Sequence, residues 1–249
     1  ETFVAEIQAR LTGDLRLETA VTNIKIEDQG TCPEPVEGLK NGNLQSSIFN
    51  LQLSDGSTIT ADKIILAVPA FVAADLLAEL APEAAQTLNE IRYVSTGTIS
   101  LGYRRDELNH PLDGFGIVIP RSEKRKINAI TWTSTKFHQR APKGHALLRV
   151  FFGGSRTPEM MDIDDADLLR TVRRELQEIM GVNAKPLFHR IYRWQRSNPQ
   201  YDVGHLDRVT AIEAALPPNI FVTGSPYRGI GIPDCVHQGK EIAQRVAQT

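Results

Sequence analysis

The chain has 249 residues, of which 41% are hydrophobic and 23% charged, and this composition is typical of a globular protein with a packed core. The length fits one large domain or two ordinary ones. A formal net charge of −2 gives no field of one sign that would favour nucleic acid binding. No apolar run approaches the length of a membrane span, and we expect no secretory signal peptide.

The cysteines and histidines argue against a disulfide scaffold and against a metal centre. The two cysteines, Cys32 and Cys235, are typical of a protein of the reducing cytoplasm, although sequence alone leaves a disulfide open. The six histidines are scattered, and none stands at metal-ligand spacing from Cys, Asp or Glu. We therefore predict a cytoplasmic protein without a metal site.

The first 60 residues predict a helix followed by a small antiparallel sheet. Helical period runs through residues 1–11, which begin with Glu rather than Met, so we expect a piece of a longer protein. The apolar face of this helix consists of Val4, Ile7 and Leu11. Alternating residues then predict strands, interrupted by a long polar loop at 27–46 and a turn at 55–56. The expected strands lie at 21–26, 49–53 and 57–60.

The next part of the chain predicts a buried strand, helices and several more strands. Residues 64–68 form a continuous apolar run, as expected of a strand covered on both faces. Two short helices follow at 70–80 and 82–91, and the clearest helix spans 164–180, with aspartates at its start and Gly181 at its end. The further strands are expected at 98–103, 115–119, 127–133, 147–152 and 187–194.

The last thirty residues carry the most informative pattern. An apolar strand at 219–223 ends at Gly224, a glycine-rich loop follows, and an amphipathic helix opens at Pro233. A helix start has free N–H groups and a partial positive charge, and glycines let a ligand approach the backbone. Such a loop can hold an anion or a ring that gathers negative charge, but a strand-to-helix turn that binds nothing has the same pattern. The apolar side chains expected to pack this helix are Val236, Ala243 and Val246.

In chain order, the elements predict a mixed α/β (α+β) fold. A small antiparallel sheet comes first, then a buried strand and helices. Several alternating strands and a helix follow, and a second buried strand with a helix closes the chain. This order indicates a nucleotide-type α/β domain in two pieces, with a substrate domain of antiparallel sheet and helices inserted between them.

Three stretches, at 61–69, 193–205 and 221–239, carry a resemblance to a known family. The second contains PQYDVGH at 199–205, and the third contains GIGIPDC at 229–235. With support from TWT at 131–133 and RAP at 140–142, the chain resembles the oxygen-dependent protoporphyrinogen and coproporphyrinogen oxidases of haem biosynthesis. These enzymes belong to the FAD-dependent amine-oxidase-like superfamily.

The same resemblance indicates what this sequence lacks. The family opens with a Gly-x-Gly-x-x-Gly loop that holds the FAD pyrophosphate, and this sequence contains no such motif. The resemblance therefore implies a C-terminal portion of the enzyme, which we expect to bind FAD weakly or not at all and to have no turnover alone. It implies a partial FAD-binding domain at 1–69, a substrate-binding domain at 70–205, and a C-terminal segment of the FAD-binding domain at 206–249.

The resemblance also assigns contacts with FAD. Gly231, Ile232 and Pro233 match the loop and helix start that face the flavin ring, where backbone N–H groups stabilise the negative charge of a reduced flavin. The other matched positions are Val21, Ala67 and Pro69 on the adenosine side, Gly224 at the strand end, and Trp194 beside the flavin. Each also has an ordinary structural alternative, namely a turn, a helix start or core packing.

No catalytic side chain is predicted, because the resemblance implies flavin chemistry. A porphyrinogen would lose a hydride from a bridging carbon and protons from its ring nitrogens, and O2 would reoxidise the flavin. The protein would hold the substrate in a roomy apolar cavity with cationic groups for its carboxylates. The candidate cations Arg104, Arg105, Arg121 and Arg125 lie in the inserted region, but we expect them to form solvated surface.

Two other classes of function stay open. The chain could come from another oxidase or desaturase of the superfamily, which would share the C-terminal loop but not the segment at 199–205. It could also be a non-catalytic remnant that binds a tetrapyrrole or a partner. Exposed apolar surface would then be covered by self-association or by pairing with an N-terminal segment. Peripheral attachment to a membrane, which some members of the family show, is left open as well.

Overall fold

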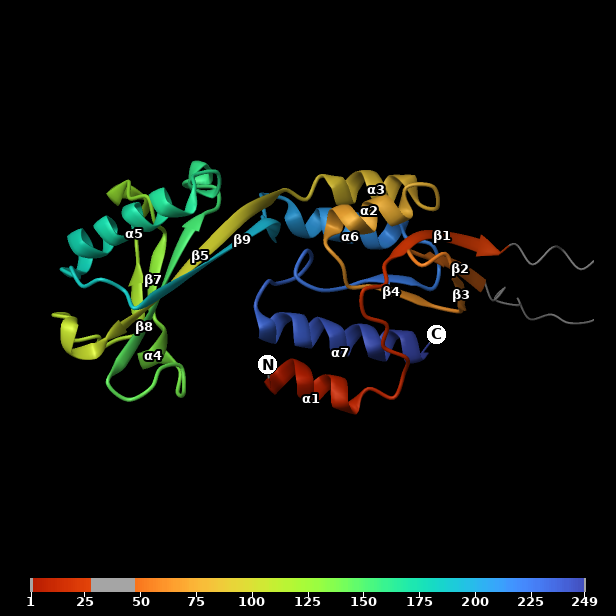
Figure 1. Ribbon diagram of the computed structural model, residues 1–249. Helices are drawn as coiled ribbons and strands as arrows, with labels where there is room; N and C mark the ends of the chain where they lie inside the picture. The colour runs from red at the N-terminus through yellow and green to blue at the C-terminus, as the bar shows by residue number, and fades with distance from the viewer. Residues whose placement is uncertain (1, 28–47, 249) are drawn as a thin grey trace, which may run out of the picture. The chain divides into compact units, whose positions relative to one another are not determined.

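A computed structural model describes residues 2–27 and 48–248, which form two compact units (Figure 1). The first unit combines Glu1–Ile91 with Asp202–Thr249, and the second is the continuous segment Arg92–Tyr201. The insertion was placed at 70–205 from sequence, whereas residues 70–91 cluster with the first unit. Cys32 and nearly all of the loop expected at 27–46 lie outside the described residues.

The N-terminal part of the first unit has the predicted helix and small sheet. Its elements are α1 (Thr2–Arg10), β1 (Val21–Glu27), β2 (Ile48–Leu53) and β3 (Thr58–Ala61). The three strands pair antiparallel in the order β1-β2-β3. The turn before β3 depends on Asp55, whose Oδ1 accepts the Ser57 N–H at 2.9 Å, and on Gly56, whose φ of 84° favours glycine. The predicted helix and hairpin are therefore confirmed.

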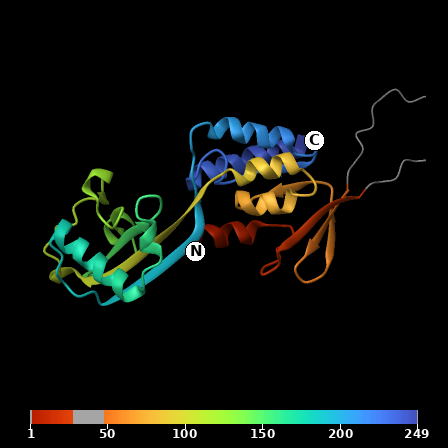
Figure 2. The same ribbon diagram turned by 90° about the horizontal axis from the view of Figure 1, so that it is seen from above.

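A two-stranded parallel sheet forms the centre of the first unit. It pairs β4 (Ile64–Leu66) with β10 (Ile220–Val222). In Figure 1, α2 (Ala70–Leu77), α3 (Pro82–Asn89) and α6 (His205–Ala215) lie on one side of the pair, and α1 and α7 (Ile232–Gln248) lie on the other. Figure 2 shows α2, α3 and α6 as one layer, in which α3 contacts both of the other helices.

Two sequence predictions about this unit are wrong, and one helix was missed. β4 was expected to be covered on both faces, but Ile65 is 42% exposed, whereas Ile64 and Leu66 on the other face are buried. The final helix buries Gln238 and Ile242, whereas Val236 and Ala243, which were expected to pack, are exposed. Gln238 faces inward because its Nε2 donates to Gly229 O at 3.3 Å. The missed helix is α6, which buries few apolar side chains and therefore has a weak helical pattern.

The second unit is a five-stranded antiparallel sheet with helix α5 (Asp165–Met180) packed on one face (Figure 1). The strand order is β6-β7-β8-β5-β9. The bounds are β5 (Tyr93–Arg104), β6 (Gly116–Val118), β7 (Ala129–Trp132), β8 (His145–Gly153) and β9 (Phe188–Pro199). Short helical turns connect them at η1 (Arg105–Glu107), η2 (Arg121–Glu123), α4 (Thr133–Lys136) and η3 (Pro158–Met161).

The core of the second unit lies between this sheet and α5. The face formed by Ile99, Leu101 and Tyr103 is buried, as predicted. It belongs to one cluster with the apolar stripe of α5, which includes Leu168, Val172 and Leu176. The helix has both expected ends, because Asp164 Oδ1 accepts the Asp167 N–H at 2.8 Å and Gly181 is left-handed at φ 69°.

Candidate functional site

The carboxyl ends of β4 and β10 form one candidate site in the first unit. Because the strands are parallel, the residues that follow them lie at the same edge, and the Thr223 N–H donates to Leu66 O at 3.1 Å. Ala67 and Gly224 come directly after these two residues, and Pro69 caps the start of α2. Ligands of open α/β sheets bind outside this edge. The structure thus brings Ala67 and Gly224, which were predicted to contact FAD, to one edge.

The glycine loop after β10 has a backbone conformation that accounts for its glycines. Gly224 has φ 107° and Gly229 has φ 145°, a region in which side chains are strained. The Tyr227 N–H closes the turn by donating to Gly224 O at 3.2 Å. The structural alternative is therefore sufficient to explain why these positions are glycine, and their contact with FAD stays a prediction.

The start of α7 offers fewer donors than the sequence suggested. The Gly231 N–H donates to Asp234 Oδ2 at 3.1 Å, and Pro233 has no N–H. The first bond of the helix runs from the Cys235 N–H to Gly231 O at 2.9 Å. An acceptor placed at this helix start would therefore meet the N–H groups of Ile232 and Asp234, which precede that bond. The Ile232 side chain beside them is exposed.

A cavity of about 400 Å³ lies beside this loop, between α6, the end of β10 and α7. Its polar lining is held by pairs: Arg228 donates to Glu213 at 2.7 Å, and the Arg228 N–H donates to Gln238 Oε1 at 3.4 Å. Other lining residues are Thr223, Tyr227, Ile242 and Arg245. Because charged and amide groups dominate its wall, this cavity does not match the apolar tetrapyrrole cavity that the resemblance implied.

The remaining predicted residues lie elsewhere. Val21 starts β1 and is half-buried opposite Leu53, and β1 contacts α2. Trp194 belongs to the second unit. His205, the last residue of the motif at 199–205, is buried, and its Nε2 donates to Tyr227 O at 2.8 Å. Among the described residues there is no cluster of His, Cys, Asp and Glu that could hold a metal ion, and no helix that could cross a membrane.

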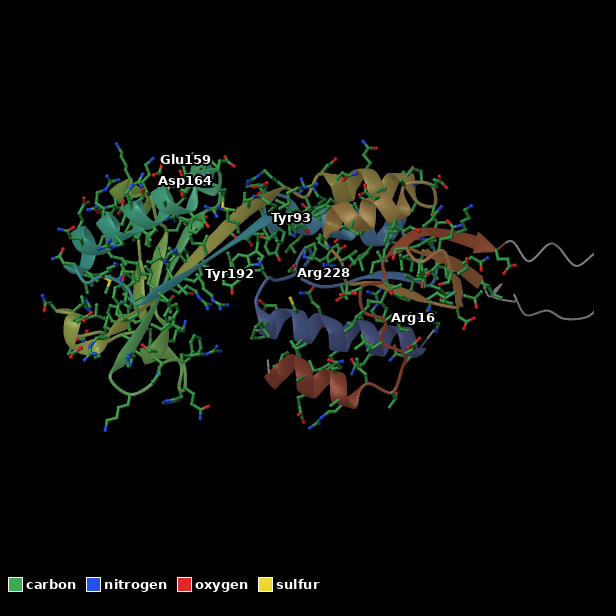
Figure 3. All side chains as sticks on the ribbon, in the orientation of Figure 1. Arg16, Tyr93, Glu159, Asp164, Tyr192 and Arg228 are labelled. Carbon is green, nitrogen blue, oxygen red and sulfur yellow. The ribbon has the colours of Figure 1, made fainter. Side chains whose placement is uncertain are left out.

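The second unit has another candidate surface, on the face of its sheet opposite α5. We call it the open face. Side chains alternate along a strand, so Thr98, Ser100 and Gly102 of β5 point to this face when Ile99 and Leu101 point to α5. Figure 3 shows Tyr192 of β9 and Asp164 at the start of α5 on opposite sides of the sheet.

Apolar and aromatic side chains line one end of the open face. In the row through Thr98, the cross-strand partners are Phe151 on β8 and Tyr192 on β9, and Trp194 follows on the same strand face. The Tyr192 and Trp194 rings are stacked, with centroids 5.8 Å apart and planes at 15°. Val118, Tyr192 and Trp194 are 80%, 47% and 46% exposed. We call Val118, Phe151, Tyr192 and Trp194 the aromatic row.

The next row of the open face is cationic. Ser100 pairs with Arg149 on β8 and with Arg190 on β9, and Arg149 Nε donates to Ser100 Oγ at 3.4 Å. These arginines escaped the sequence analysis because their alignment depends on strand register. The arginines considered there behave as expected where they pair at the surface: Arg104 bonds Asp106 at 3.3 Å, and Arg125 pairs with Glu178.

The first unit has a parallel strand pair followed by a glycine loop, and the second unit has an antiparallel sheet with one helix on it, so the fold is mixed α/β. Residues 1–247 match the family described as flavin containing amine oxidoreductase. The chain belongs to this family, which confirms the predicted resemblance, fold class and flavin cofactor at the level of the family.

Curated relatives narrow the similarity within the family. The chain is 34% identical over 221 residues to the coproporphyrinogen III oxidase of Bacillus subtilis (strain 168), a match that covers 87% of this chain and 47% of that protein. It is 30% identical over 253 residues to the chloroplastic protoporphyrinogen oxidase of Nicotiana tabacum, covering 96% of this chain and 43% of that protein. The chain therefore spans about half the length of the curated relatives it matches.

Solved structures share the fold. A protein from Exiguobacterium sp. 255-15 that is assigned as a protoporphyrinogen oxidase aligns with a TM-score of 0.80 at 24% identity, over 98% of this chain and 50% of that one. A putrescine oxidase variant, A394C, aligns with a TM-score of 0.69 at 14% identity, over all of this chain and 52% of the other.

Proposed function

We propose that this chain is one portion of an FAD-dependent oxidase that converts a porphyrinogen to the porphyrin with O2 in haem biosynthesis. The observation that carries this proposal is the similarity to coproporphyrinogen III oxidases over most of the chain. The specific segments at 199–205 and 229–235 support it. Because the chain spans about half of these relatives and lacks the Gly-x-Gly-x-x-Gly motif, we expect the chain alone to be inactive.

The glycine loop and the start of α7 would hold the flavin. The fit rests on the backbone: positions 229 and 231 carry no side chain, and the N–H groups of Ile232 and Asp234 precede the helix's own bonds. When bound, FAD supplies the acceptor for the hydride. The role of this chain there is to stabilise negative charge with fixed dipoles. The contacts that we propose are at Val21, Ala67, Pro69, Trp194, Gly224, Gly231, Ile232 and Pro233.

The open face would hold the tetrapyrrole. A flat macrocycle needs a broad apolar surface, and the aromatic row provides one that is exposed and made of rigid side chains. We therefore propose that the ring lies against Phe151 and Tyr192 and that the protein's part in catalysis is positioning.

Exposed apolar side chains on the first unit support a partner. Val4 and Ile7 of α1 and Leu11 just after it, which were expected to form one apolar face, are exposed, and α7 exposes Ile232 and Val236. Such surface is costly in water. We propose that it pairs with an N-terminal segment of the same enzyme and that the isolated chain self-associates through it. Sizing by light scattering tests this, and a monodisperse monomer would contradict it.

A cytoplasmic location, with peripheral attachment to a membrane as the alternative, belongs to the same proposal. Fractionation of cells that produce the chain, followed by a salt wash of the membranes, separates the two locations. Nucleic acid has no part in the proposed function.

A complementation experiment tests the function. FAD is titrated into the chain alone, and into the chain mixed with the N-terminal half of the Bacillus subtilis relative, and flavin fluorescence and porphyrin formation are followed. We expect binding and turnover only in the mixture. Micromolar FAD binding by the chain alone would contradict the expectation that the phosphate loop is needed for FAD binding. The absence of both binding and turnover in the mixture would favour a non-catalytic, partner-binding remnant.

A further inference from the structure

We propose that Arg149 and Arg190 bind the carboxylates of the tetrapyrrole and thereby make the open face selective for anionic macrocycles. The inference rests on the proposed function, because it assumes that a tetrapyrrole lies on this face. It adds the two residues that would orient the ring and select it by charge, and neither of them belongs to the segments that carry the family resemblance.

Register places the two guanidinium groups on one row and on the same face. Arg149 and Arg190 are the cross-strand partners of Ser100 on either side of β5. Neighbouring strands lie about 4.8 Å apart, so the two backbone positions are separated by about 10 Å. Ser100 between them is short and accepts a bond from Arg149. The pair therefore spans a width on the scale of one tetrapyrrole edge, and no bulky side chain separates the two.

In the part of the chain that the structure describes, neither arginine is paired with a carboxylate, unlike other arginines of the second unit. Within residues 2–27 and 48–248, no ion pair engages Arg149 or Arg190, although both side chains are exposed. By contrast Arg193, on the other face of β9, bonds Asp165 at 2.5 Å. A guanidinium without an ion-pair partner can donate two parallel hydrogen bonds to a carboxylate without first breaking an ion pair.

Apolar side chains in the rows on either side of the arginines indicate the class of ligand that this surface would bind. On one side is the aromatic row, and on the other side Gly102 pairs with Leu147 and Phe188, with Phe188 lying across the glycine. A free phosphate or an acidic peptide would use the cations alone. A flat ring with carboxylates along one edge would use both the cations and the aromatic row. Its ring would lie on Phe151 and Tyr192, and its carboxylates would bind the arginines.

Charge across the whole unit favours the same class of ligand. Residues 92–201 contain 19 lysines and arginines against 11 aspartates and glutamates, a net charge of +8. The rest of the chain contains 9 basic and 19 acidic residues, a net charge of −10. Long-range attraction would therefore direct an anionic macrocycle to the second unit, and this part of the attraction would weaken with salt.

Binding of two porphyrins tests the inference. The probes are coproporphyrin III, which carries four carboxylates, and its tetramethyl ester, which has the same ring without the charges. Binding to the complete chain is followed by quenching of tryptophan fluorescence, because Trp194 is exposed on this face and Trp132 is buried. Arg149→Gln, Arg190→Gln and the double variant are compared with Arg174→Gln, which removes one exposed positive charge from α5.

We expect each single substitution on the open face to weaken coproporphyrin binding roughly tenfold, as for a lost charge-assisted hydrogen bond, and the double variant to weaken it further. We expect Arg174→Gln to change the affinity for coproporphyrin III less than twofold. The tetramethyl ester should bind all variants with the same affinity. Equal coproporphyrin affinity in the wild type and the double variant would overturn the arginine assignment and leave the aromatic row as the binding surface. No binding of either porphyrin to the wild-type chain would overturn the use of the open face itself.

Discussion

The two units of this chain differ in charge and in the completeness of their cores. The second unit is one continuous segment with a net charge of +8, and a single cluster of buried residues joins its sheet to α5. The first unit is made from two separate segments, has a net charge of −10, and contains a three-stranded and a two-stranded sheet. It also exposes apolar side chains on α1 and α7.

This difference fits the two tasks of the proposed oxidase, namely binding of the substrate and binding of the cofactor. The second unit has what a rigid platform for a large ligand requires, namely a sheet fixed by a continuous core. The first unit provides the loop and helix start proposed for the flavin, and its exposed apolar side chains form the surface that we propose pairs with further protein. We therefore expect substitutions in the core of the second unit to act on stability, and those in the glycine loop to act on cofactor binding.

The largest effect is expected from Leu148→Ala in the core of the second unit. Leu148 is completely buried on β8, so the substitution leaves a cavity and should lower the free energy of unfolding by about 3 kcal/mol. Urea denaturation followed by circular dichroism measures it. The control is Leu187→Ala, at a side chain that is exposed, with an expected change below about 0.5 kcal/mol. Similar losses for both variants would contradict the proposed core.

The pH dependence of stability tests the same core through Tyr103. Burial raises the pKa of this phenol from 10.0 to about 12. Between these values the unfolded chain loses the proton while the folded chain keeps it, so the free energy of unfolding falls by about 2 kcal/mol as pH rises from 10 to 12. Well below pH 10 the group contributes no pH dependence, because it is protonated in both states. Denaturation at several pH values should show this slope in the wild type and a reduced slope in Tyr103→Phe, and equal slopes would refute it.

Gly229→Ala probes the loop of the first unit. The residue has φ 145°, and a Cβ there would lie 2.5 Å from that of Asp234, so we expect a loss of about 1 to 2 kcal/mol. We also expect FAD binding by the complemented mixture to weaken more than tenfold, because the loop must shift. The matched control is Gly239→Ala in α7, where nothing lies within 4 Å of the new Cβ. Unchanged FAD affinity in Gly229→Ala would separate the loop from the cofactor.

The smallest effect is expected from Asp164→Ala at the start of α5. The substitution removes the acceptor for the Asp167 N–H and should cost about 1 kcal/mol. Asp162→Ala, which removes an exposed carboxylate just before the cap, is the control and should change stability by less than half as much. Thermal melts of the two variants compare the effects, and a larger loss in Asp162→Ala would show that general charge, not capping, is responsible.

Much of the fold could be predicted because its signals are local. The hairpin at Asp55–Gly56 and the capped helix α5 follow from turn residues, caps and apolar period. The missed helix α6 and the inward-facing Gln238 of α7 depend on contacts between distant segments, such as the bond of Gln238 to Gly229. Local pattern cannot show such contacts, so apolar Val236 was wrongly expected to pack in place of a polar side chain.

The candidate site divides in the same way. The segments near Gly224 and Gly231 could be found from sequence because each is a continuous motif. The open face could not be found, because Arg149, Ser100 and Arg190 come from three strands and meet only through cross-strand register. Sequence analysis instead considered the arginines grouped along the chain at 104–105 and 121–125, and Arg104 and Arg125 among them pair with carboxylates at the surface.

A crystal structure of the chain with coproporphyrin III tests most directly whether the second unit binds the substrate. We expect the macrocycle on the open face of the second unit, with its ring against Phe151 and Tyr192 and its carboxylates at Arg149 and Arg190. A macrocycle that makes no contact with the open face and is bound instead in the cavity lined by Arg228 and Arg245 would contradict it.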